Sequence, residues 1–321
     1  MGKRLLGIIV LAGLLLLPPP PANGLYLLDV GQGDAILLTT DQGHTLLVDG
    51  GAPGSVLLPL SAVGVGEIDI LVATHYDADH AGGLIDVLET YTVHEVWLPS
   101  VEPHTETAER LWQLVQAENA QVRFPQAGDH FTLDAFNISV LSPDPNAPPS
   151  SDTSTNDQAV VLGVSLGITD IFLTSDAPAS RVQSAWERWL SETPPSLPLE
   201  ILKVGHHGST TSTTTALVTQ LQPQLAVISV GVRNRYGHPA AQTLQTLEQA
   251  GVPVQRTDQQ GTLRFLVYPD GRVAQENRPP GILAWLQYLS TTHPRTQLTD
   301  MLYFWHAKKI QTSESPDTQG E

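Results

Sequence analysis

The sequence predicts a mixed α/β domain built as a two-sheet sandwich with helices outside. From Leu25 to Val267, short apolar segments of strand length alternate with longer segments of helical periodicity. The 26 glycines and 25 prolines are spread along the chain, as expected for many tight connections between short elements. Hydrophobic side chains make up 41% of the 321 residues, enough to bury one large core or two modest ones.

The amino terminus has the pattern of a targeting segment. Lys3 and Arg4 precede an unbroken apolar run, Leu5–Leu17, which ends at the prolines Pro18–Pro21. We therefore expect residues 1–24 to be a signal peptide or an N-terminal anchor, with a buried first helix as the alternative. Export would make the protein secreted, periplasmic or anchored to the outer face of the cytoplasmic membrane.

Apolar runs bounded by turn residues predict the strands. The first three, Leu25–Val30, Ala35–Thr39 and Thr45–Val48, are separated by glycine-containing turns, which predicts an antiparallel start. Further strands are expected at Asp69–Thr74, Asn137–Leu141, Ala159–Val164, Thr169–Leu173, Glu200–Val204, Leu225–Val230, Val252–Arg256 and Thr262–Val267.

Helical periodicity predicts the outer layers, and composition predicts where the domain ends. The stretch Ser142–Asp157 is rich in Pro, Ser and Asp and is expected to be a long surface loop. The domain should span residues 25–276, and residues 277–321 should form a partly disordered tail, in which Gly281–Leu289 could make one amphipathic helix. Helices are expected at Gly82–Tyr91, Thr105–Asn119, Ala177–Leu190, Thr213–Leu221 and Ala240–Ala250.

Charge and composition restrict the function. The sequence has no cysteine, so any metal site must use His, Asp or Glu side chains. The formal net charge of −17 repels polyanions and disfavours tight, sequence-independent DNA binding. Each bound divalent cation would add two positive charges, so the active site of an acidic protein can still attract an anion.

A cluster of potential metal ligands follows the strand Asp69–Thr74 directly. It contains His75, Asp77, Asp79 and His80, on a corner where a strand gives way to a helix. Carboxylate oxygens mixed with imidazoles suit zinc, manganese or iron, and a shared carboxylate can bridge two such ions. The alternative is a polar loop with accidental histidines, but the strand-then-helix context favours a metal site.

Two further segments place polar residues at the ends of apolar strands. Asp176 follows Thr169–Leu173, and on position alone it would more often cap the next helix. His206 and His207 follow Glu200–Val204. Because successive side chains at a strand end diverge, we expect at most one of the pair to face the metal directly, while the other could contact substrate.

Seven segments together resemble the metallo-β-lactamase-like domain of the ComEC competence and DNA-uptake proteins. The resemblance covers Leu25 to about Val267 and implies an αββα four-layer sandwich with two divalent metal ions, zinc or manganese. It also implies that His75, Asp77, Asp79 and His80 are ligands, that Asp176 bridges the metals, and that His206 or His207 completes the second site. The segments are DVGQGDAILL at 29–38, LLVDGG at 46–51, THYDADHAGGL at 74–84, LTSDA at 173–177, LKVGHHGS at 202–209, NRYGHP at 234–239 and RTDQQGT at 256–262.

The resemblance implies further roles that spacing alone could not assign. It makes Asp49 a supporting carboxylate behind the ligands and puts Asn234, Tyr236 and His238 on the substrate side. Asp49 and His238 could equally be turn residues. The family's place for a further metal-binding histidine falls near Asn156, where none is present. We expect this to leave an open coordination position on one metal, with Asn156 near the substrate.

These features favour phosphodiester hydrolysis, because an open position on a metal is where a water is acidified for attack. In this reading Asp79 would orient the water and His238 would protonate the leaving oxygen or bind phosphate. Ser209, with Thr210 and Thr211, could bind a phosphate oxygen or could simply cap the next helix. The substrate would be a phosphoester or nucleic acid, with single-stranded DNA plausible.

The chain also departs from the ComEC pattern, since it has no counterpart of their channel-like membrane region. We therefore expect an extracytoplasmic nuclease or phosphodiesterase, with or without a separate membrane channel protein as partner. The alternatives are hydrolysis of another ester, a lactam or a lactone, and a non-catalytic metal-holding partner of a channel. Asp77 replaces the second histidine of the His-x-His-x-Asp-His pattern usual in lactam and lactone hydrolases, which favours phosphoesters.

Overall fold

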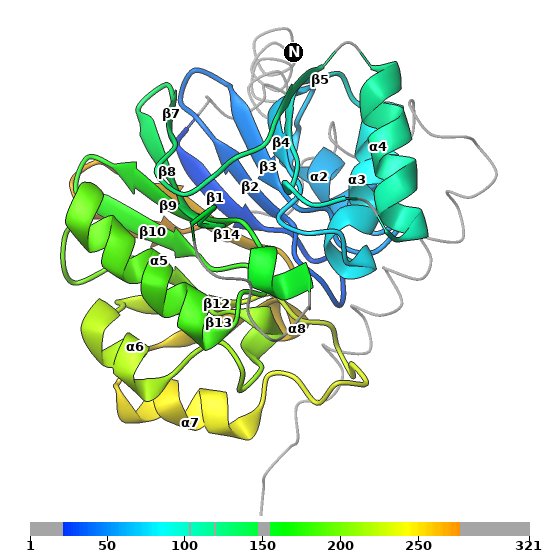
Figure 1. The fold of residues 1–321 in the computed structure, drawn as a ribbon. Helices are drawn as coiled ribbons and strands as arrows, with labels where there is room; N and C mark the ends of the chain where they lie inside the picture. The colour runs from blue at the N-terminus through cyan, green and yellow to red at the C-terminus, as the bar shows by residue number, and fades with distance from the viewer. Residues whose placement is uncertain (1–21, 103, 119, 147–154, 277–321) are drawn as a thin grey trace, which may run out of the picture.

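Two β-sheets pack face to face and carry helices on both outer faces (Figure 1). This is the arrangement of a computed structural model that describes residues 22–102, 104–118, 120–146 and 155–276. The four layers match the αββα sandwich that the sequence predicts. Residues 1–21 of the expected signal segment 1–24 and the expected tail from residue 277 lie outside the described residues, and Gly24 already belongs to the first strand.

The first sheet has eight strands in the order β15-β14-β1-β2-β3-β4-β5-β6. Its strands are antiparallel from β15 to β3, as predicted for the start of the chain, and parallel from β3 to β6. The strands are β1 Gly24–Leu27, β2 Ile36–Thr39, β3 Thr45–Val48, β4 Ile68–Val72, β5 Val93–Trp97, β6 Gln121–Arg123, β14 Leu263–Val267 and β15 Val273–Gln275.

The second sheet has seven strands in the order β13-β12-β11-β10-β9-β8-β7. Its strands are parallel from β13 to β10 and antiparallel from β10 to β7. The strands are β7 His130–Leu133, β8 Phe136–Ser142, β9 Val161–Leu166, β10 Thr169–Leu173, β11 Ile201–Lys203, β12 Leu225–Ile228 and β13 Val254–Arg256.

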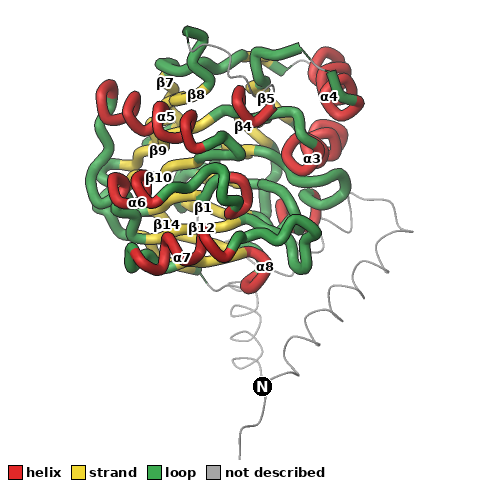
Figure 2. The backbone as a smooth tube through the Cα atoms, turned by 60° about the horizontal axis from the view of Figure 1, so that its bottom comes forward, coloured by secondary structure: helices red, strands yellow, loops and turns green. Residues whose placement is uncertain are grey.

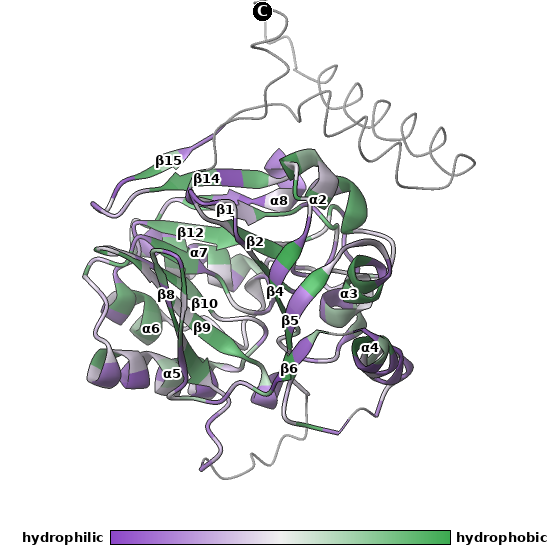
Figure 3. Cartoon of the chain, turned by 90° about the horizontal axis from the view of Figure 1, so that it is seen from above, coloured by the Kyte–Doolittle hydropathy of each residue, from purple (hydrophilic) through white to green (hydrophobic). Residues whose placement is uncertain are grey.

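Helices cover the two sheets in separate groups (Figures 1 and 2). Each group buries an apolar face and turns polar residues to solvent (Figure 3). The first sheet carries α2 Leu57–Val63, α3 Ala78–Thr90 and α4 Glu106–Ala117; the second carries α5 Ala179–Glu192, α6 Thr215–Leu221 and α7 Ala241–Gln249. The short elements are α8 Thr257–Gln260 and the 3₁₀ turns η1 Thr155–Gln158 and η2 His206–Gly208.

The main core lies between the sheets. Inward-facing side chains of β1 to β3, among them Leu25 and Leu38, are buried in one cluster with Phe136, Leu162 and Ile171 of the second sheet. Within the described parts of the chain, no helix combines the length and apolar character needed to cross a membrane.

The start of α3 corrects the sequence prediction. The helix begins at Ala78, four residues before the predicted Gly82, and so contains Asp79 and His80. Gly82 and Gly83 lie inside the helix. A Cβ at Gly82 would overlap Pro53, and a Cβ at Gly83 would overlap the carbonyl oxygen of Gly50. These glycines therefore permit close packing; they do not mark a helix start.

Several short elements have no counterpart in the prediction. They are the helices α2 and α8 and the strands β5, β6, β7 and β15. The two strands β6 and β15 span three residues each and have few buried side chains, so apolar periodicity could not reveal them.

Candidate metal centre

The predicted ligands meet where parallel strands of both sheets end. The strand β4 leads into His75 and then α3, and β3 leads into Asp49. From the second sheet, β10 leads into Asp176, and β11 leads into His206 and His207. Parallel strands present their carboxyl ends at one edge, so ligands from distant parts of the sequence converge there.

The centre of the cluster is a group of four buried residues: Asp34, His80, Asp176 and His207. One potential ligand atom from each lies within 4.8 Å of those of the others. The Oδ2 atom of Asp176 lies 3.3 Å from Nε2 of His80 and 3.4 Å from Nε2 of His207. A carboxylate between two imidazoles is placed where it could bridge two cations.

The potential ligand atoms fit a metal because they point toward one another and several of them have no hydrogen-bond partner. Nε2 of His75, His80 and His207 and Oδ1 of Asp176 are buried and have no hydrogen-bond partner. Buried polar atoms are almost always paired, since leaving one unpaired costs about 1–3 kcal/mol. Three imidazole nitrogens and a carboxylate are a donor set that a divalent transition metal would satisfy.

Asp49 orients these donors from behind. Its Oδ2 atom accepts from Nδ1 of His80 at 2.8 Å and from the hydroxyl of Thr74 at 2.7 Å. The Thr74 hydroxyl oxygen lies 3.0 Å from Nδ1 of His75 and accepts from the Ser175 hydroxyl at 2.8 Å. Since Thr74 donates to Asp49, it must accept from His75, which leaves Nε2 of His75 free for a metal.

Two histidines of the cluster hold protons more tightly than usual when no metal neutralises the nearby carboxylates, whereas burial and the neighbouring His80 lower the pKa of the third, His75. Burial lowers the pKa of His80, but Asp176 and Asp49 outweigh it and the net pKa is well above the ordinary value. The pKa of His207 rises to about 9, because Asp176 and Asp34 likewise outweigh burial. Burial raises the pKa of Asp176, but His80 and His207 hold it well below its usual range. The buried carboxylates therefore favour positive charge at this site, either as protons on the histidines or as metal ions.

Asp176 does not cap a helix, because α5 begins only at Ala179 and follows Pro178. The Asp176 side chain points into the cluster instead. Of the two adjacent histidines, His207 is 2% exposed and its Nε2 also lies 3.5 Å from Oδ2 of Asp79. His206 is the more exposed, and its Nε2 lies 3.5 Å from Oδ2 of Asp176. Both imidazoles thus reach the bridging position, one from the interior and one from the solvent side.

A loop after β12 forms the solvent side of the site. The ring of His238 lies 5.8 Å from that of His206, and the exposed ring of Tyr236 stacks on His238 at 6.0 Å. Asn234 braces this loop: its side chain bonds the backbone of Gly231, Tyr236 and His238. The side-chain amide of Asn234 is therefore used to hold the loop together.

Three other predicted site residues have different surroundings. The Asp77 side chain is half-exposed, accepts from the Thr155 hydroxyl at 2.7 Å and lies 3.7 Å from Nε2 of His75. Asn156 follows Thr155 on η1. Ser209 is buried and accepts from the Thr211 hydroxyl at 3.1 Å. The expectation that Ser209 opens a helix is wrong, because α6 begins at Thr215 after a Thr214 cap.

Sequence reasoning missed Asp34, Lys203, Thr74 and Ser175. Lys203 is fully buried on β11 and forms an ion pair with Asp34. Burial raises the pKa of Asp34, but Lys203 and His207 hold it below its usual range. A lysine within the apolar strand Ile201–Lys203 was the one available signal, since buried lysines are rare unless paired.

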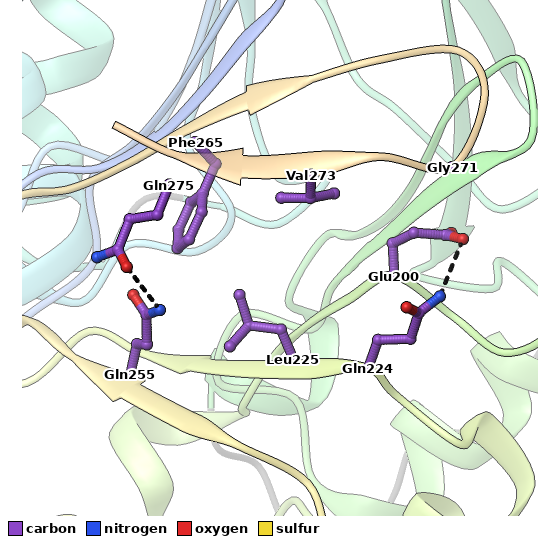
Figure 4. Close-up of a pocket in the computed structure, with 8 residues that line it drawn as sticks. All are labelled: Glu200, Gln224, Leu225, Gln255, Phe265, Gly271, Val273 and Gln275. Atoms are coloured by element: carbon purple, nitrogen blue, oxygen red, sulfur yellow. Dashed lines mark hydrogen bonds between the residues drawn. The ribbon is translucent and has the colours of Figure 1, made fainter. Parts of the chain in front are cut away.

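A separate cavity of about 220 Å³ lies away from this chemistry (Figure 4). It opens between the edges of the two sheets, where Gln255 of β13 bonds Gln275 of β15 at 3.1 Å. Glu200 and Leu225 line it at the amino ends of β11 and β12, whereas the ligands follow the carboxyl ends. This cavity is therefore not part of the candidate metal centre.

Comparison with known families agrees with this geometry. The family model described as the metallo-beta-lactamase superfamily matches residues 28–232. The chain belongs to this superfamily. Its members are generally metal-dependent hydrolases, and the matched residues include every residue of the buried cluster.

Curated relatives include competence proteins. The chain is 31% identical to ComE operon protein 3 of Bacillus subtilis over 74% of this chain and 32% of the relative. It is 31% identical to Recombination protein 2 of Haemophilus influenzae over 78% of this chain and 30% of the relative. Competence protein ComA of Neisseria gonorrhoeae is 26% identical over 87% and 38% of the two chains. The chain thus spans about a third of the length of these relatives.

Solved structures support the fold alone. CmlA from Streptomyces venezuelae, a diiron beta-hydroxylase, superposes with a TM-score of 0.52 and 14% identity over 81% of this chain and 55% of CmlA. A metal-dependent hydrolase of the beta-lactamase superfamily superposes with a TM-score of 0.50 and 12% identity over 79% of this chain and all of that chain. The predicted fold and the predicted resemblance to competence proteins are confirmed.

Proposed function

We propose that the protein is a binuclear-metal-dependent phosphodiesterase or nuclease that acts on DNA or nucleotides outside the cytoplasm. The observation that carries this proposal is the convergence of unpaired buried donors from His75, His80, His207 and Asp176. Two divalent ions, zinc or manganese, would satisfy these donors. When bound, they would supply Lewis acidity toward an ester oxygen and acidify a water.

In this proposal some residues of the site bind the metals and others transfer or orient protons. His75, His80 and His207 would hold the metals, with Asp77 and His206 as additional ligands on the open side and Asp176 between the two sites. Asp79, whose side chain is one-third exposed and lies 3.5 Å from His207, would accept a hydrogen bond from the attacking water and orient it. His238, on the solvent side, would donate a proton to the leaving oxygen or bind phosphate. Burial and the nearby His206 lower the pKa of His238, so its proton-donating form is the minor one at neutral pH.

The loop over the site favours an anionic, aromatic substrate. Within a chain of net charge −17, residues 231–239 contain two arginines and no acidic residue. The guanidinium of Arg235 lies 5.1 Å above the ring of Tyr236, which is 52% exposed. Exposed aromatic rings beside arginines suit the stacking of bases and the binding of phosphates, so a nucleotide or single-stranded DNA is the preferred substrate.

The similarity to competence proteins supports a connection with DNA uptake. In this proposal the protein would process DNA beside a separate membrane channel protein. The charged start at Lys3 and Arg4 and the apolar run Leu5–Leu17 support action outside the cytoplasm, secreted, periplasmic or anchored to the membrane's outer face. Fractionation of cells that express the full chain tests this: retention of the uncut chain in the cytoplasm would contradict it.

A substrate screen tests the reaction. Full-length protein loaded with zinc or manganese is assayed on bis-p-nitrophenyl phosphate, dinucleotides, single-stranded DNA, a lactone and a β-lactam. We expect turnover of the phosphodiesters only. Preferred cleavage of the lactone or lactam would replace the proposed reaction, and no turnover of any substrate by fully loaded protein would favour a non-catalytic metal-holding role.

The loop is tested by the paired change Arg233→Gln and Arg235→Gln. Because these guanidiniums would contact phosphates beyond the cleaved bond, KM for single-stranded DNA should rise about 10-fold or more, while kcat on bis-p-nitrophenyl phosphate stays unchanged. Arg272→Gln, an exposed arginine on the β14–β15 turn, is the matched control. Equal effects of the two changes on DNA would rule out the loop as the binding surface.

A further inference from the structure

A buried ion pair includes Asp34, one of the four residues at the centre of the candidate metal site. The Lys203 ammonium is fully buried and contacts Oδ2 of Asp34, which is 1% exposed. Removing two charges from water is expensive, and a buried ion pair is often no more stable than apolar residues of the same size. Its presence beside the cluster therefore points to a role other than stability.

Asp34 connects this pair to a candidate ligand. Its second oxygen, Oδ1, is buried without a hydrogen-bond partner and lies 3.4 Å from Nδ1 of His207, close enough for a favourable charge interaction. The same Nδ1 lies 3.0 Å from the carbonyl oxygen of Ser229. A carbonyl can only accept, so Nδ1 carries the hydrogen and the lone pair of the neutral ring is on Nε2, which faces Asp79 and Asp176.

The backbone holds Asp34 in a fixed place. Its amide donates to the carbonyl oxygen of Asp79 at 3.2 Å, and its own carbonyl accepts from Gly51 at 2.8 Å. The preceding carbonyl, of Gly33, accepts from the Ser229 hydroxyl at 2.7 Å. The loop after β3, the start of α3 and the end of β12 thus all fix the position of one carboxylate.

We propose that Lys203 and Asp34 form a positioning pair that holds the ring of His207 in the orientation needed for metal binding, while the Ser229 carbonyl sets its tautomer. The Lys203 ammonium holds one carboxylate oxygen, so the other stays turned toward Nδ1 of His207 and the Nε2 lone pair stays turned toward the metal site. The pair plays for His207 the part that Asp49 plays for His80. This inference rests on the metal centre of the proposed function, but not on the reaction.

Direct ligation by Asp34 is the competing role, since its carboxylate is within ligand range of the cluster. The two roles predict opposite effects of Lys203→Met. If Asp34 were a ligand, loss of a nearby positive charge would leave metal affinity unchanged or raise it. If Asp34 is a positioning residue, loss of the ammonium releases its carboxylate and metal affinity falls.

The test is zinc binding by the full-length chain, measured by competition with a chromophoric chelator. We expect Lys203→Met and Asp34→Asn each to weaken zinc binding at one of two sites by roughly 10–100-fold, the range typical for residues behind a ligand. In zinc-loaded, histidine-labelled protein, long-range ¹H–¹⁵N spectra should show one tautomer of His207 in the wild type and a changed ring signal in both variants.

The matched control is Asp170→Asn, a buried carboxylate on β10 that bonds the Ser196 amide at 2.5 Å, away from the cluster. It should lower the melting temperature without changing zinc affinity. If Lys203→Met fails to fold, Lys203→Arg retains the charge in an altered geometry and should show a smaller loss. Variants that are less stable but bind zinc as the wild type does, with an unchanged His207 signal, would overturn the inference.

The outcomes separate this inference from the proposed function. A wild-type chain that binds two zinc ions but cleaves no phosphodiester would overturn the reaction and leave the positioning pair intact. Equal zinc binding by wild type and both variants would overturn the positioning pair alone. A wild-type chain that binds neither zinc nor manganese would overturn both.

Discussion

At the scale of single residues, most candidate ligands were predictable, but of the residues that support them Asp49 alone was predicted. His75, His80, Asp176 and the pair His206-His207 all follow apolar strands, so local pattern was enough to find them. The contacts behind them join distant residues: Ser175 to Thr74 across 101 positions and Lys203 to Asp34 across 169. No local periodicity encodes such pairings, which form only when the two sheets meet.

Asp176 gives the sharpest test at this scale. Asp176→Ala removes the carboxylate that lies between His80 and His207, so both metals should bind weakly. We expect less than half the wild-type metal content and a loss of phosphodiesterase activity on the order of 100-fold or more. Metal content is measured by mass spectrometry after dialysis. Asp144→Ala, which removes a pairing with Arg188 and a hydrogen bond from the Asn146 amide, is the control. Wild-type metal content in Asp176→Ala would refute the assignment.

His207 predicts how the metal-free protein responds to pH. Its folded pKa of about 9 exceeds its ordinary value of 6.5, so folding favours the protonated ring. The resulting stability is fully present below pH 6.5 and is lost as the pH rises through about 9.

We therefore expect the melting temperature of chelator-treated protein to fall between these two pH values, and to fall less in His207→Gln. Zinc-loaded protein should not share this fall, since zinc binds the neutral ring. A melting temperature of the metal-free protein that rises with pH over this interval would contradict the expectation.

At the scale of elements, close packing at the β1–β2 turn and at α3 shapes the site. The sequence placed β1 to β4 correctly but started α3 too late, because glycines that allow close approach look like helix boundaries. The strands β5 to β7 went unnoticed since their burial comes from neighbours in the sheet and not from a long apolar run.

The turn between β1 and β2 offers a matched pair of glycines. A Cβ at Gly33 would overlap the carbonyl oxygen of Asp79, whereas a Cβ at Gly31 meets nothing within 4 Å; both residues have positive φ. Gly31→Ala should cost only the backbone strain, about 1–2 kcal/mol. Gly33→Ala should cost more than that and weaken metal binding, because it displaces Asp79. Urea denaturation and metal titration measure both; equal costs would contradict the packing argument.

At the scale of the whole molecule, the acidic net charge opposes the basic loop at the site. A charge of −17 slows the approach of long polyanions, and two bound cations offset only part of it. The charge was evident from composition, but the stacking of Tyr236 on His238 was not, since it depends on how the loop after β12 folds beside His206.

The opposition between the acidic net charge and the basic loop predicts an unusual salt dependence of the rate on DNA. Long-range repulsion is screened by salt, so kcat/KM for long single-stranded DNA relative to a dinucleotide should rise between about 0.01 M and about 0.15 M salt. Steady-state rates on the two substrates, at fixed metal loading, measure the ratio. A ratio that falls steeply with salt would mean that a basic surface dominates binding, as in ordinary DNA-binding proteins.

The candidate ligands come from both sheets: His75 and His80 from the first, Asp176 and His207 from the second. A bound ion would therefore cross-link the two sheets of the sandwich. Ligands that bind only the folded form stabilise it in proportion to the logarithm of their free concentration. Metal supply would thus set the lifetime of the protein as well as its activity, so that chains starved of metal are the first to be degraded by proteases.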